Sequence, residues 1–264
     1  MSQVMSDTLK FLAIETSTDK LSVALSRGAQ TWHHHGVGGA NASAQLIPVI
    51  QDLLGQAQLT LNDLTALVIG HGPGSFTGLR TACSVAQGLA LGAHLKVIQI
   101  DTLMAVAEEA RWQLSNAGTA GKANIQRVGV LMDARMSEVY AGAYQWVPNS
   151  HQWESVLPLQ VGPPEAMWAV LRNLTIPCDA IAGNGLDVYQ DRLSLNGNMA
   201  AEVPFLRAAA MPHALALLRL ASAPWALDQA VSPEHVQPLY IRDKVAQTTA
   251  EREALKAAQT PSLE

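Results

Sequence analysis

The sequence predicts an α/β fold built from two duplicated halves. Short apolar runs rich in β-branched residues alternate with longer segments of helical periodicity, which is typical of the α/β class. Two features also recur along the chain. The acidic turn residues Glu15 and Asp133 are 118 positions apart, and the Gly-x-Gly pairs that begin at Gly70 and Gly183 are 113 apart. Because these offsets are nearly equal, we interpret them as the trace of an old duplication.

In the first half, "KFLAIE", "LSVALSRG", "LTALVIG" and "KVIQID" predict strands. Helical spacing predicts a helix over 43–57, with Ser43 as its N-cap and a kink or frayed first turn at Pro48. A second helix is expected over 77–91, with Gly92 as its C-terminal stop. The segment between the second strand and the first helix, "TWHHHGVGGANAS", is expected to be a polar connection. "TLMAVAEEARWQL" predicts a further helix.

The second half repeats this order. "RVGVLMDARMSEVYAGAY" again predicts strand, turn and strand, "PPEAMWAVLRNL" a helix, and "CDAIAGNGLDVY" a strand that ends in Gly-x-Gly. The small polar segment "SNAGTAGKANIQ" separates the halves, so we expect them to span residues 1–112 and 123–242. "HALALLRLA" predicts a late helix that packs back on the first half, and the polar tail over 243–264 is expected to be loosely held.

Composition narrows the classes of function. Hydrophobic residues make up 48% of the 264 residues and charged residues 15%, enough for a sizeable core. A net charge of −5 argues against a broad nucleic-acid surface, which needs clustered Lys and Arg. Two cysteines far apart, Cys83 and Cys178, are typical of a reducing compartment. No secretory signal or membrane-length apolar run is visible, so we expect a cytoplasmic protein without membrane contact.

The glycine-rich segment "VIGHGPGSFTGLRTACSVAQGLALG" (68–92) raises the question of phosphate binding. It matches neither the Walker A loop, nor the Gly-x-Gly-x-x-Gly dinucleotide motif, nor the Gly-x-Ser-x-Gly nucleophile turn. Backbone N–H groups at a helix start still bind anions, so Gly72, Gly74 and Ser75 are candidate phosphate ligands, with Ser75 or Thr77 as helix cap. The simpler interpretation is a tight strand-to-helix turn with close backbone packing, and the spacing alone favours it.

Glu15 and Asp133 occupy matching turns, and Thr16, Ser17 and Arg135 lie beside them in sequence. Carboxylates that face each other across a cleft could bind a metal or act as acid and base. Alternatively, each carboxylate organises its own hairpin turn. The pattern alone leaves both interpretations open, and it adds Thr16, Ser17, Asp133 and Arg135 to the candidate nucleotide or phosphate site.

Two other features have plainer interpretations. The three adjacent histidines at 33–35 would point to alternating faces of an extended segment, so we expect solvated loop histidines rather than a metal site. Cys83 lies on an apolar helix without a neighbouring base, which indicates a buried structural thiol. On that helix Ala82, Ala86 and Gly88 keep one side thin, which fits either packing on the chain's own sheet or a subunit contact.

Four segments resemble the TsaB family: "FLAIETSTDKLSVAL", "GHGPGSFTGLRTACSVAQGLALG", "MDARMSEVYAGAY" and "VQPLYIRD". The matches lie in order between Phe11 and Asp243. The resemblance implies an actin-like (ASKHA) fold of two RNase H-like halves, in the glycoprotease-like or YeaZ group. It also implies a cytoplasmic partner of TsaD and the ATPase TsaE. Together these transfer threonylcarbamoyl to the adenosine beside the anticodon of ANN-decoding tRNAs, which this chain would meet only through the complex.

The catalytic relative TsaD carries a His-x-x-x-His metal site soon after its glycine-rich helix. If "GLALG" fixes the register, those positions fall near Thr102 and Val106 of this sequence, and neither side chain replaces an imidazole ligand. The resemblance therefore implies a non-catalytic subunit, without metal or cofactor, that stabilises and positions TsaD. It leaves open whether a nucleotide binds in the cleft or at an interface of the complex. The alternatives are an actin-like ATPase or kinase and, less favoured, a glycoprotease-like metallopeptidase.

The resemblance also implies where the partner binds. The helices over 43–57 and 77–91 would pack against the equivalent pair of TsaD, and the same surface would support a homodimer when the chain is alone. The residues expected at this interface are Leu46, Ile50, Leu53, Arg80, Cys83, Ala86, Gln87 and Ala90.

Overall fold

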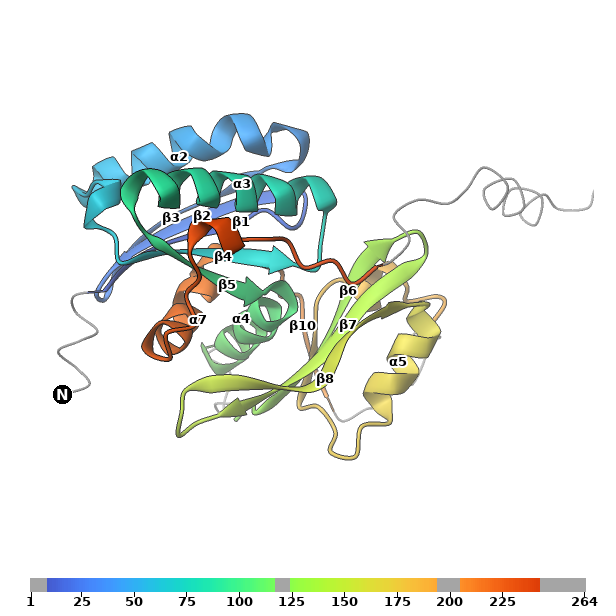
Figure 1. The fold of residues 1–264 in the computed structure, drawn as a ribbon. Coiled ribbons are helices and arrows are strands. Elements are labelled where there is room, and N and C mark those ends of the chain that lie inside the picture. The colour runs from blue at the N-terminus through green and yellow to red at the C-terminus, as the bar shows by residue number, and fades with distance from the viewer. Residues whose placement is uncertain (1–8, 117–123, 194–204, 243–264) are drawn as a thin grey trace, which may run out of the picture.

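The computed structural model describes residues 9–116, 124–193 and 205–242, and it contains two α/β halves that lie side by side (Figure 1). The expected tail over 243–264 and the middle of the expected linker, 117–123, lie outside the described residues. Each half holds a five-stranded sheet. The strands are β1 (Lys10–Glu15), β2 (Lys20–Arg27), β3 (Gln30–Val37), β4 (Ala66–Gly72), β5 (Lys96–Asp101), β6 (Arg127–Arg135), β7 (Glu138–Val147), β8 (Gln152–Gly162), β9 (Ala180–Ala182) and β10 (Leu206–Ala208).

The two sheets repeat one strand order. The first runs β3-β2-β1-β4-β5, and the second, read in the matching direction, runs β8-β7-β6-β9-β10. In the first sheet β1 pairs antiparallel with β2 and parallel with β4, and in the second β6 pairs antiparallel with β7 and parallel with β9. Because five strands follow the same path twice, the predicted α/β fold of two duplicated RNase H-like halves is confirmed.

The helices form layers around these sheets. On the first sheet α2 and α3 cover one face (Figure 1), while α7 packs against the other, and α4 contacts strands of both sheets. Helix α5 covers the second sheet. The helices are α2 (Ala42–Ala57), α3 (Phe76–Ala93), α4 (Thr102–Asn116), α5 (Pro164–Arg172), α6 (Gly185–Val188) and α7 (Ala214–Ala226), with 3-10 turns η1 (Gly39–Asn41), η2 (Leu61–Asp63) and η4 (Pro233–His235). Among the described residues no helix is long and apolar enough to cross a membrane.

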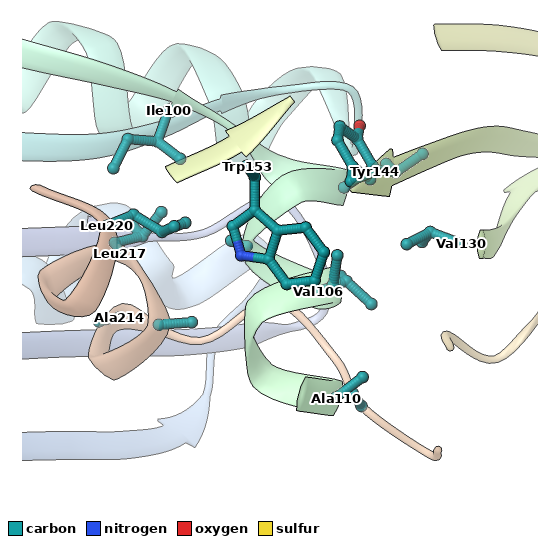
Figure 2. Packing of buried hydrophobic residues seen from close by; sticks show 14 of the residues in the cluster. Ile100, Val106, Ala110, Val130, Tyr144, Trp153, Ala214, Leu217 and Leu220 are labelled. Atoms are coloured by element: carbon teal, nitrogen blue, oxygen red, sulfur yellow. The ribbon is translucent and has the colours of Figure 1, made fainter. Parts of the chain in front are cut away.

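One hydrophobic core is shared by both halves. Its buried side chains come from the first sheet, from α4 and α7, and from the second sheet. Val106 of α4, Trp153 of β8, Leu217 of α7 and Tyr144 of β7 all belong to this cluster and are labelled in Figure 2. Because this core is continuous, separating the halves would expose apolar surface to water, which is unfavourable by roughly 25 cal/mol per Å².

The structure corrects the expected polar connection after the second strand, because residues 30–37 form β3. The strand pairs with β2 without interruption, from Lys20 opposite Val37 to Arg27 opposite Gln30. Thr31, Trp32 and Val37 are good strand formers, and histidine is compatible with a strand whose side chains alternate between two faces. The histidines at 33–35 therefore lie in a strand and not in the expected loop, while His33 and His35 are exposed as expected. Strands β8 and β10 were also not expected.

Helix ends differ from the expected positions in two places, while one of the two expected caps of α3 is confirmed. Helix α2 begins at Ala42 with Asn41 at its cap, so Ser43 is not the N-cap, and the helix continues through Pro48 without a frayed first turn. Helix α3 passes Gly92 and ends at Ala93, and the C-cap residue His94 takes the left-handed conformation with φ 54°. Ser75 caps α3, since its side chain accepts a hydrogen bond from the Gly78 N–H.

The cap of α7 predicts a pH dependence of stability. The Nδ1 atom of His213 accepts the Leu215 N–H at 3.2 Å, and burial, followed by the neighbouring His35, lowers the pKa of His213 from 6.5. The unfolded chain therefore binds a proton more readily than the folded one, and the free energy of unfolding falls as the pH drops below about 6.5.

Substituting His213→Asn retains a cap acceptor but removes this titration. We expect the variant to lose less stability than the wild type between pH 7.5 and pH 5.5, measured as the urea midpoint at each pH. Equal losses in the two proteins would contradict the assignment to His213.

Candidate functional site

A cleft of about 530 Å³ lies between the two halves. Ser17, Gly74 and Ser75 line it from the first half, and Asp133 and Arg135 line it from the second. The structure thus brings five of the seven candidate phosphate-site residues to one cavity. The other two do not line it. The Thr16 hydroxyl donates to the Gly78 carbonyl at 2.7 Å, and the Gly72 N–H donates to the Thr102 hydroxyl at 3.1 Å.

The glycine-rich loop packs directly against the turn between β1 and β2. The Ser75 N–H donates to the Ser17 carbonyl at 2.7 Å, so one N–H at the helix start is already held by the chain itself. A Cβ atom at Gly74 would lie 2.6 Å from the Ser17 Cβ, and one at Gly78 would lie 1.8 Å from the Thr16 carbonyl oxygen. The glycines thus permit the close backbone approach that the simpler interpretation predicts.

Each of the two matching carboxylates organises its own turn. Glu15 Oε1 accepts the Ser17 N–H at 2.6 Å, and Asp133 Oδ1 accepts the Arg135 N–H at 2.9 Å. Glu15 is buried outside the cleft lining, and burial raises its pKa although hydrogen bonds from Ser17 oppose the change. Asp133 faces the cleft and also accepts the Tyr189 hydroxyl at 2.8 Å. The structure therefore does not join the two carboxylates in one acid–base pair.

The expected partner-interface residues are mostly inside the chain. Six of the eight are buried: Leu46, Ile50, Leu53, Cys83, Ala86 and Ala90. They belong to the core cluster between the first sheet and α2 and α3, so the apolar stripe of these helices is covered by their own sheet. Arg80 donates a hydrogen bond to the Tyr240 hydroxyl at 2.9 Å, and Gln87 donates one to the Val236 carbonyl at 3.0 Å. Both side chains therefore contact the C-terminal segment. A partner cannot reach the six buried side chains, which corrects that assignment.

The outward sides of the same two helices carry glycines that the chain's own packing does not explain. A Cβ atom at Gly55, Gly88 or Gly92 would meet nothing within 4 Å. Glycine inside a helix destabilises it by roughly 0.5–1 kcal/mol relative to alanine. Leu91, on the same side of α3, is 70% exposed. This outer face is thin and partly apolar, as a surface approached closely by another helix would be.

Comparisons with known proteins assign the chain to a family. The family model described as "TsaD: tRNA N6-adenosine threonylcarbamoyltransferase" matches residues 30–250. The "tRNA threonylcarbamoyladenosine biosynthesis protein TsaB" of Escherichia coli (strain K12) is 33% identical over 90% of this chain and 96% of that protein. The chain belongs to the TsaB family. The TsaB protein of Haemophilus influenzae is 32% identical over 90% of this chain and 95% of its own.

A solved structure agrees with TsaB membership. The protein titled "YeaZ from Pseudomonas aeruginosa" superposes with a TM-score of 0.70 at 32% sequence identity, over 88% of this chain and 99% of that one. The resemblance inferred from the four sequence segments is therefore confirmed.

In this TsaB-family chain, the start of α4 has structural contacts where the resemblance places metal ligands of TsaD. The Thr102 hydroxyl accepts the Gly72 N–H, and Val106 is fully buried in the core between the sheets (Figure 2). Among residues 9–116, 124–193 and 205–242, no group of three or more His, Cys, Asp or Glu side chains could hold a metal ion.

Two polar contacts buried beside α4 join the halves of the TsaB fold. The Tyr144 hydroxyl of β7 donates to Asp101 Oδ2 at 2.5 Å, and the Trp153 indole of β8 donates to Glu108 Oε2 at 3.1 Å. Burial raises the pKa of Asp101 to about 6, although the hydrogen bond from Tyr144 opposes the change. These residues carry no local sequence signal, because their partners lie more than 40 positions away.

The segment "VQPLYIRD", singled out as TsaB-like, crosses from one half to the other. The Leu239 N–H donates to the His71 carbonyl at 2.7 Å at the end of β4. Tyr240 packs on Phe76 with ring centroids 4.8 Å apart. Arg242 then donates to Glu138 Oε2 at 2.6 Å and to the Ala134 carbonyl at 3.0 Å, on the β6–β7 turn. The segment thus connects the first half to the part of the second half that lines the cleft.

Proposed function

We propose that the chain is a non-catalytic subunit that acts with TsaD and TsaE in the cytoplasm. The complex would transfer threonylcarbamoyl to the adenosine beside the anticodon of ANN-decoding tRNAs, and this subunit would stabilise and position TsaD. The observation that carries the proposal is at the start of α4. In a chain of this family, a buried valine at position 106 and the hydrogen-bonded Thr102 lie near the positions where the resemblance places the imidazole ligands of TsaD.

The connections between the halves support a structural role. A continuous core, the Tyr144–Asp101 hydrogen bond and the C-terminal crossing segment all oppose a hinge motion between the sheets. Enzymes that close around a substrate usually need such a motion. A subunit whose halves keep a fixed arrangement instead loses little conformational entropy when one of its surfaces binds a partner.

The outer face of α2 and α3 is the surface that we propose for TsaD, and for a homodimer when the chain is alone. Gly55, Gly88 and Gly92 let the backbone of another helix approach, and the exposed Leu91 adds apolar area. The buried residues of these helices contribute by fixing the direction in which this face points. The net charge of −5 supports contact with tRNA through the complex rather than through this chain alone.

A reconstituted reaction tests the proposal. We expect no modification of tRNA by this chain alone, and modification when TsaD and TsaE from the same source are added with the threonylcarbamoyl adenylate. Gly88→Trp, which fills open space on α3, should weaken TsaD binding at least tenfold in a titration and reduce modification in parallel.

Ala169→Trp is the matched control, because Ala169 is exposed on α5 of the other half. Ala86→Trp is unsuitable, since Ala86 is fully buried and the substitution would disrupt the core. Modification of tRNA by the chain without TsaD would refute the proposed role. Equal TsaD binding by the two tryptophan variants would refute the proposed surface.

A second candidate is nucleotide binding in the cleft, favoured by its size and its mixed lining. Arg135 and the α3 start offer positive charge and N–H groups, while Phe76, Tyr140 and three methionines offer apolar surface. The hydrogen bond from the Ser75 N–H to the Ser17 carbonyl opposes it, because a phosphate would have to displace that contact. Incubating this chain alone with ATP separates the two candidate functions. Hydrolysis of ATP by the lone chain would favour nucleotide binding in the cleft.

A further inference from the structure

The cleft between the halves contains a tyrosine whose hydroxyl group has no partner. Tyr140 lines the cleft and is only 7% exposed, and no hydrogen bond to its hydroxyl occurs within residues 9–116, 124–193 and 205–242. The hydroxyl groups of the other three tyrosines of the chain are all hydrogen-bonded. Because buried polar groups in folded proteins nearly always have a partner, this exception requires an explanation.

A second donor without a partner belongs to the same part of the cleft. Arg242 also lines it, its side chain is 9% exposed, and its guanidinium carbon lies 6.0 Å from the centroid of the Tyr140 ring. The terminal nitrogens of the guanidinium donate to Glu138, to the Ala134 carbonyl and to the Met136 sulfur. The buried Nε has no partner in the described part of the chain. Two donors that lack acceptors are therefore neighbours in one cavity.

Both groups act as donors at neutral pH. Burial raises the pKa of Tyr140 above its ordinary value, although the charge of Arg242 opposes the change, so the phenol keeps its proton. A guanidinium group only donates, and a neutral phenol donates as well as accepts. The chemical group that satisfies both side chains is therefore a hydrogen-bond acceptor.

Apolar side chains from both halves accompany these donors. Those that line the cavity are Pro73, Phe76, Leu103, Met132, Ala134, Met136 and Met211. Methionine side chains are flexible and polarisable, so they adapt to apolar groups of different shapes. The cavity volume of about 530 Å³ lies inside the range of about 300–1,000 Å³ that is typical of small-molecule sites. A few polar groups among apolar side chains are also typical of such sites.

The charges of the lining argue against a highly charged ligand. Two acids balance two arginines: Asp19, Asp133, Arg135 and Arg242. Arg135 lies 3.5 Å from Asp133 Oδ2, and Arg242 binds Glu138, so both cations are already paired. No lysine occurs among the described residues that line the cleft. A polyphosphate would thus find no unpaired cation here, whereas an uncharged molecule leaves the balance undisturbed.

We propose that the cleft binds a small uncharged molecule with an apolar body, whose hydrogen-bond acceptor lies against Tyr140 and Arg242. The class includes heteroaromatic rings and carbonyl compounds. Unlike the nucleotide considered above, such a ligand brings no phosphate to the α3 start, so the hydrogen bond from the Ser75 N–H to the Ser17 carbonyl stays in place. The shared core and the C-terminal crossing segment hold the two walls together, so the site is formed before the ligand arrives.

Two probes of the same shape test the acceptor. Quinoline and naphthalene are both bicyclic aromatics, but only quinoline carries a ring nitrogen that accepts a hydrogen bond. Dissociation constants of both are measured by saturation-transfer NMR with the full chain at pH 7.5. We expect Tyr140→Phe, which removes only the hydroxyl, to weaken quinoline binding at least fivefold and to leave naphthalene binding unchanged.

Tyr240→Phe is the matched control, because its hydroxyl lies outside the lining of the cleft. We expect it to bind both probes as the wild type does. Arg242→Lys keeps a positive charge beside Glu138 but removes the Nε donor, so it should also weaken quinoline binding selectively. If Tyr140→Phe fails to fold by circular dichroism, Arg242→Lys decides.

Methionine methyl resonances locate the bound probe. In protein labelled with ¹³C at the methionine methyl groups, quinoline should shift the resonances of Met132, Met136 and Met211, assigned by single substitutions to leucine. Met104 and Met167 do not line the cleft and serve as internal controls. Shifts confined to these two control residues would refute binding in the cleft.

A tenfold excess of ATP over quinoline tests the charge. We expect no displacement of quinoline, and displacement would refute the inference of an uncharged ligand. An absence of quinoline binding to the wild type, or an equal loss of both probes in Tyr140→Phe, would overturn the proposal as well. The cleft lies apart from the surface proposed for TsaD, and TsaD binding by Tyr140→Phe is a separate readout. Failure of the cleft site would therefore leave the proposed function untouched.

Discussion

Gly78→Ala is expected to destabilise the chain by about 3 kcal/mol or more, because the added methyl group has no space. Its Cβ would lie 1.8 Å from the Thr16 carbonyl oxygen and 2.9 Å from the carbonyl carbon. Those atoms belong to the backbone, so no side-chain rotation relieves the overlap. The Thr16 hydroxyl also donates to the Gly78 carbonyl, which ties the same two backbones together. Relief requires the β1–β2 turn to move away from α3.

Gly88→Ala, in the same helix, is the matched control. Nothing lies within 4 Å of a Cβ at that position, and alanine is the better helix former. We therefore expect it to stabilise the chain by roughly 0.5–1 kcal/mol. Urea denaturation of the two variants and the wild type measures both effects. Changes of the same sign in both variants would contradict this explanation of why α3 carries glycines.

The duplication and the fold class could be predicted from the sequence because both depend on local pattern. The hydrophobic strands and helices, and two recurring turns, suffice to indicate two α/β halves. Strand β3 was missed because the three histidines and two glycines within residues 33–38 look like a polar loop. Its pairing with β2, which the sequence does not display, decides its structure.

The site could be predicted only in part. Asp133 and Arg135 reach the cleft as a paired turn would suggest, but Glu15 does not, because its side chain turns beneath Gly70. Helical spacing identified the apolar stripe of α2 and α3 but could not show that the chain's own sheet covers it. Contacts such as Arg242 with Glu138 join residues 104 positions apart, and no local pattern encodes them.

Glu108 is the residue whose removal should most weaken the contact between the halves. Its side chain is only 2% exposed, yet both oxygens are paired. Oε1 accepts from Arg219 of α7 at 2.9 Å, and Oε2 accepts from Arg111 at 3.0 Å and from the Trp153 indole at 3.1 Å. One carboxylate on α4 thus joins the last helix to a strand of the second sheet.

Glu108→Ala leaves two partly buried guanidinium groups and one indole N–H without their acceptor. Removing one partner of a buried ionic network typically destabilises a protein by about 3–5 kcal/mol, because the remaining charge stays away from water. Arg219 retains Glu109 Oε2 at 2.5 Å, and Arg111 retains its stack on Trp146, 4.1 Å from the ring centroid. These remaining contacts place the expected loss near 3 kcal/mol.

Glu165→Ala is the control, because it removes a carboxylate that pairs with Arg192 at the surface. There the two side chains are 49% and 40% exposed, and water screens the pair, so the expected loss is about 0–1 kcal/mol. Urea denaturation of both variants at neutral pH gives the comparison. If Glu108→Ala loses no more stability than Glu165→Ala, the network does not hold the halves together. The fixed shape proposed for the subunit would then rest on the apolar core and the C-terminal segment alone.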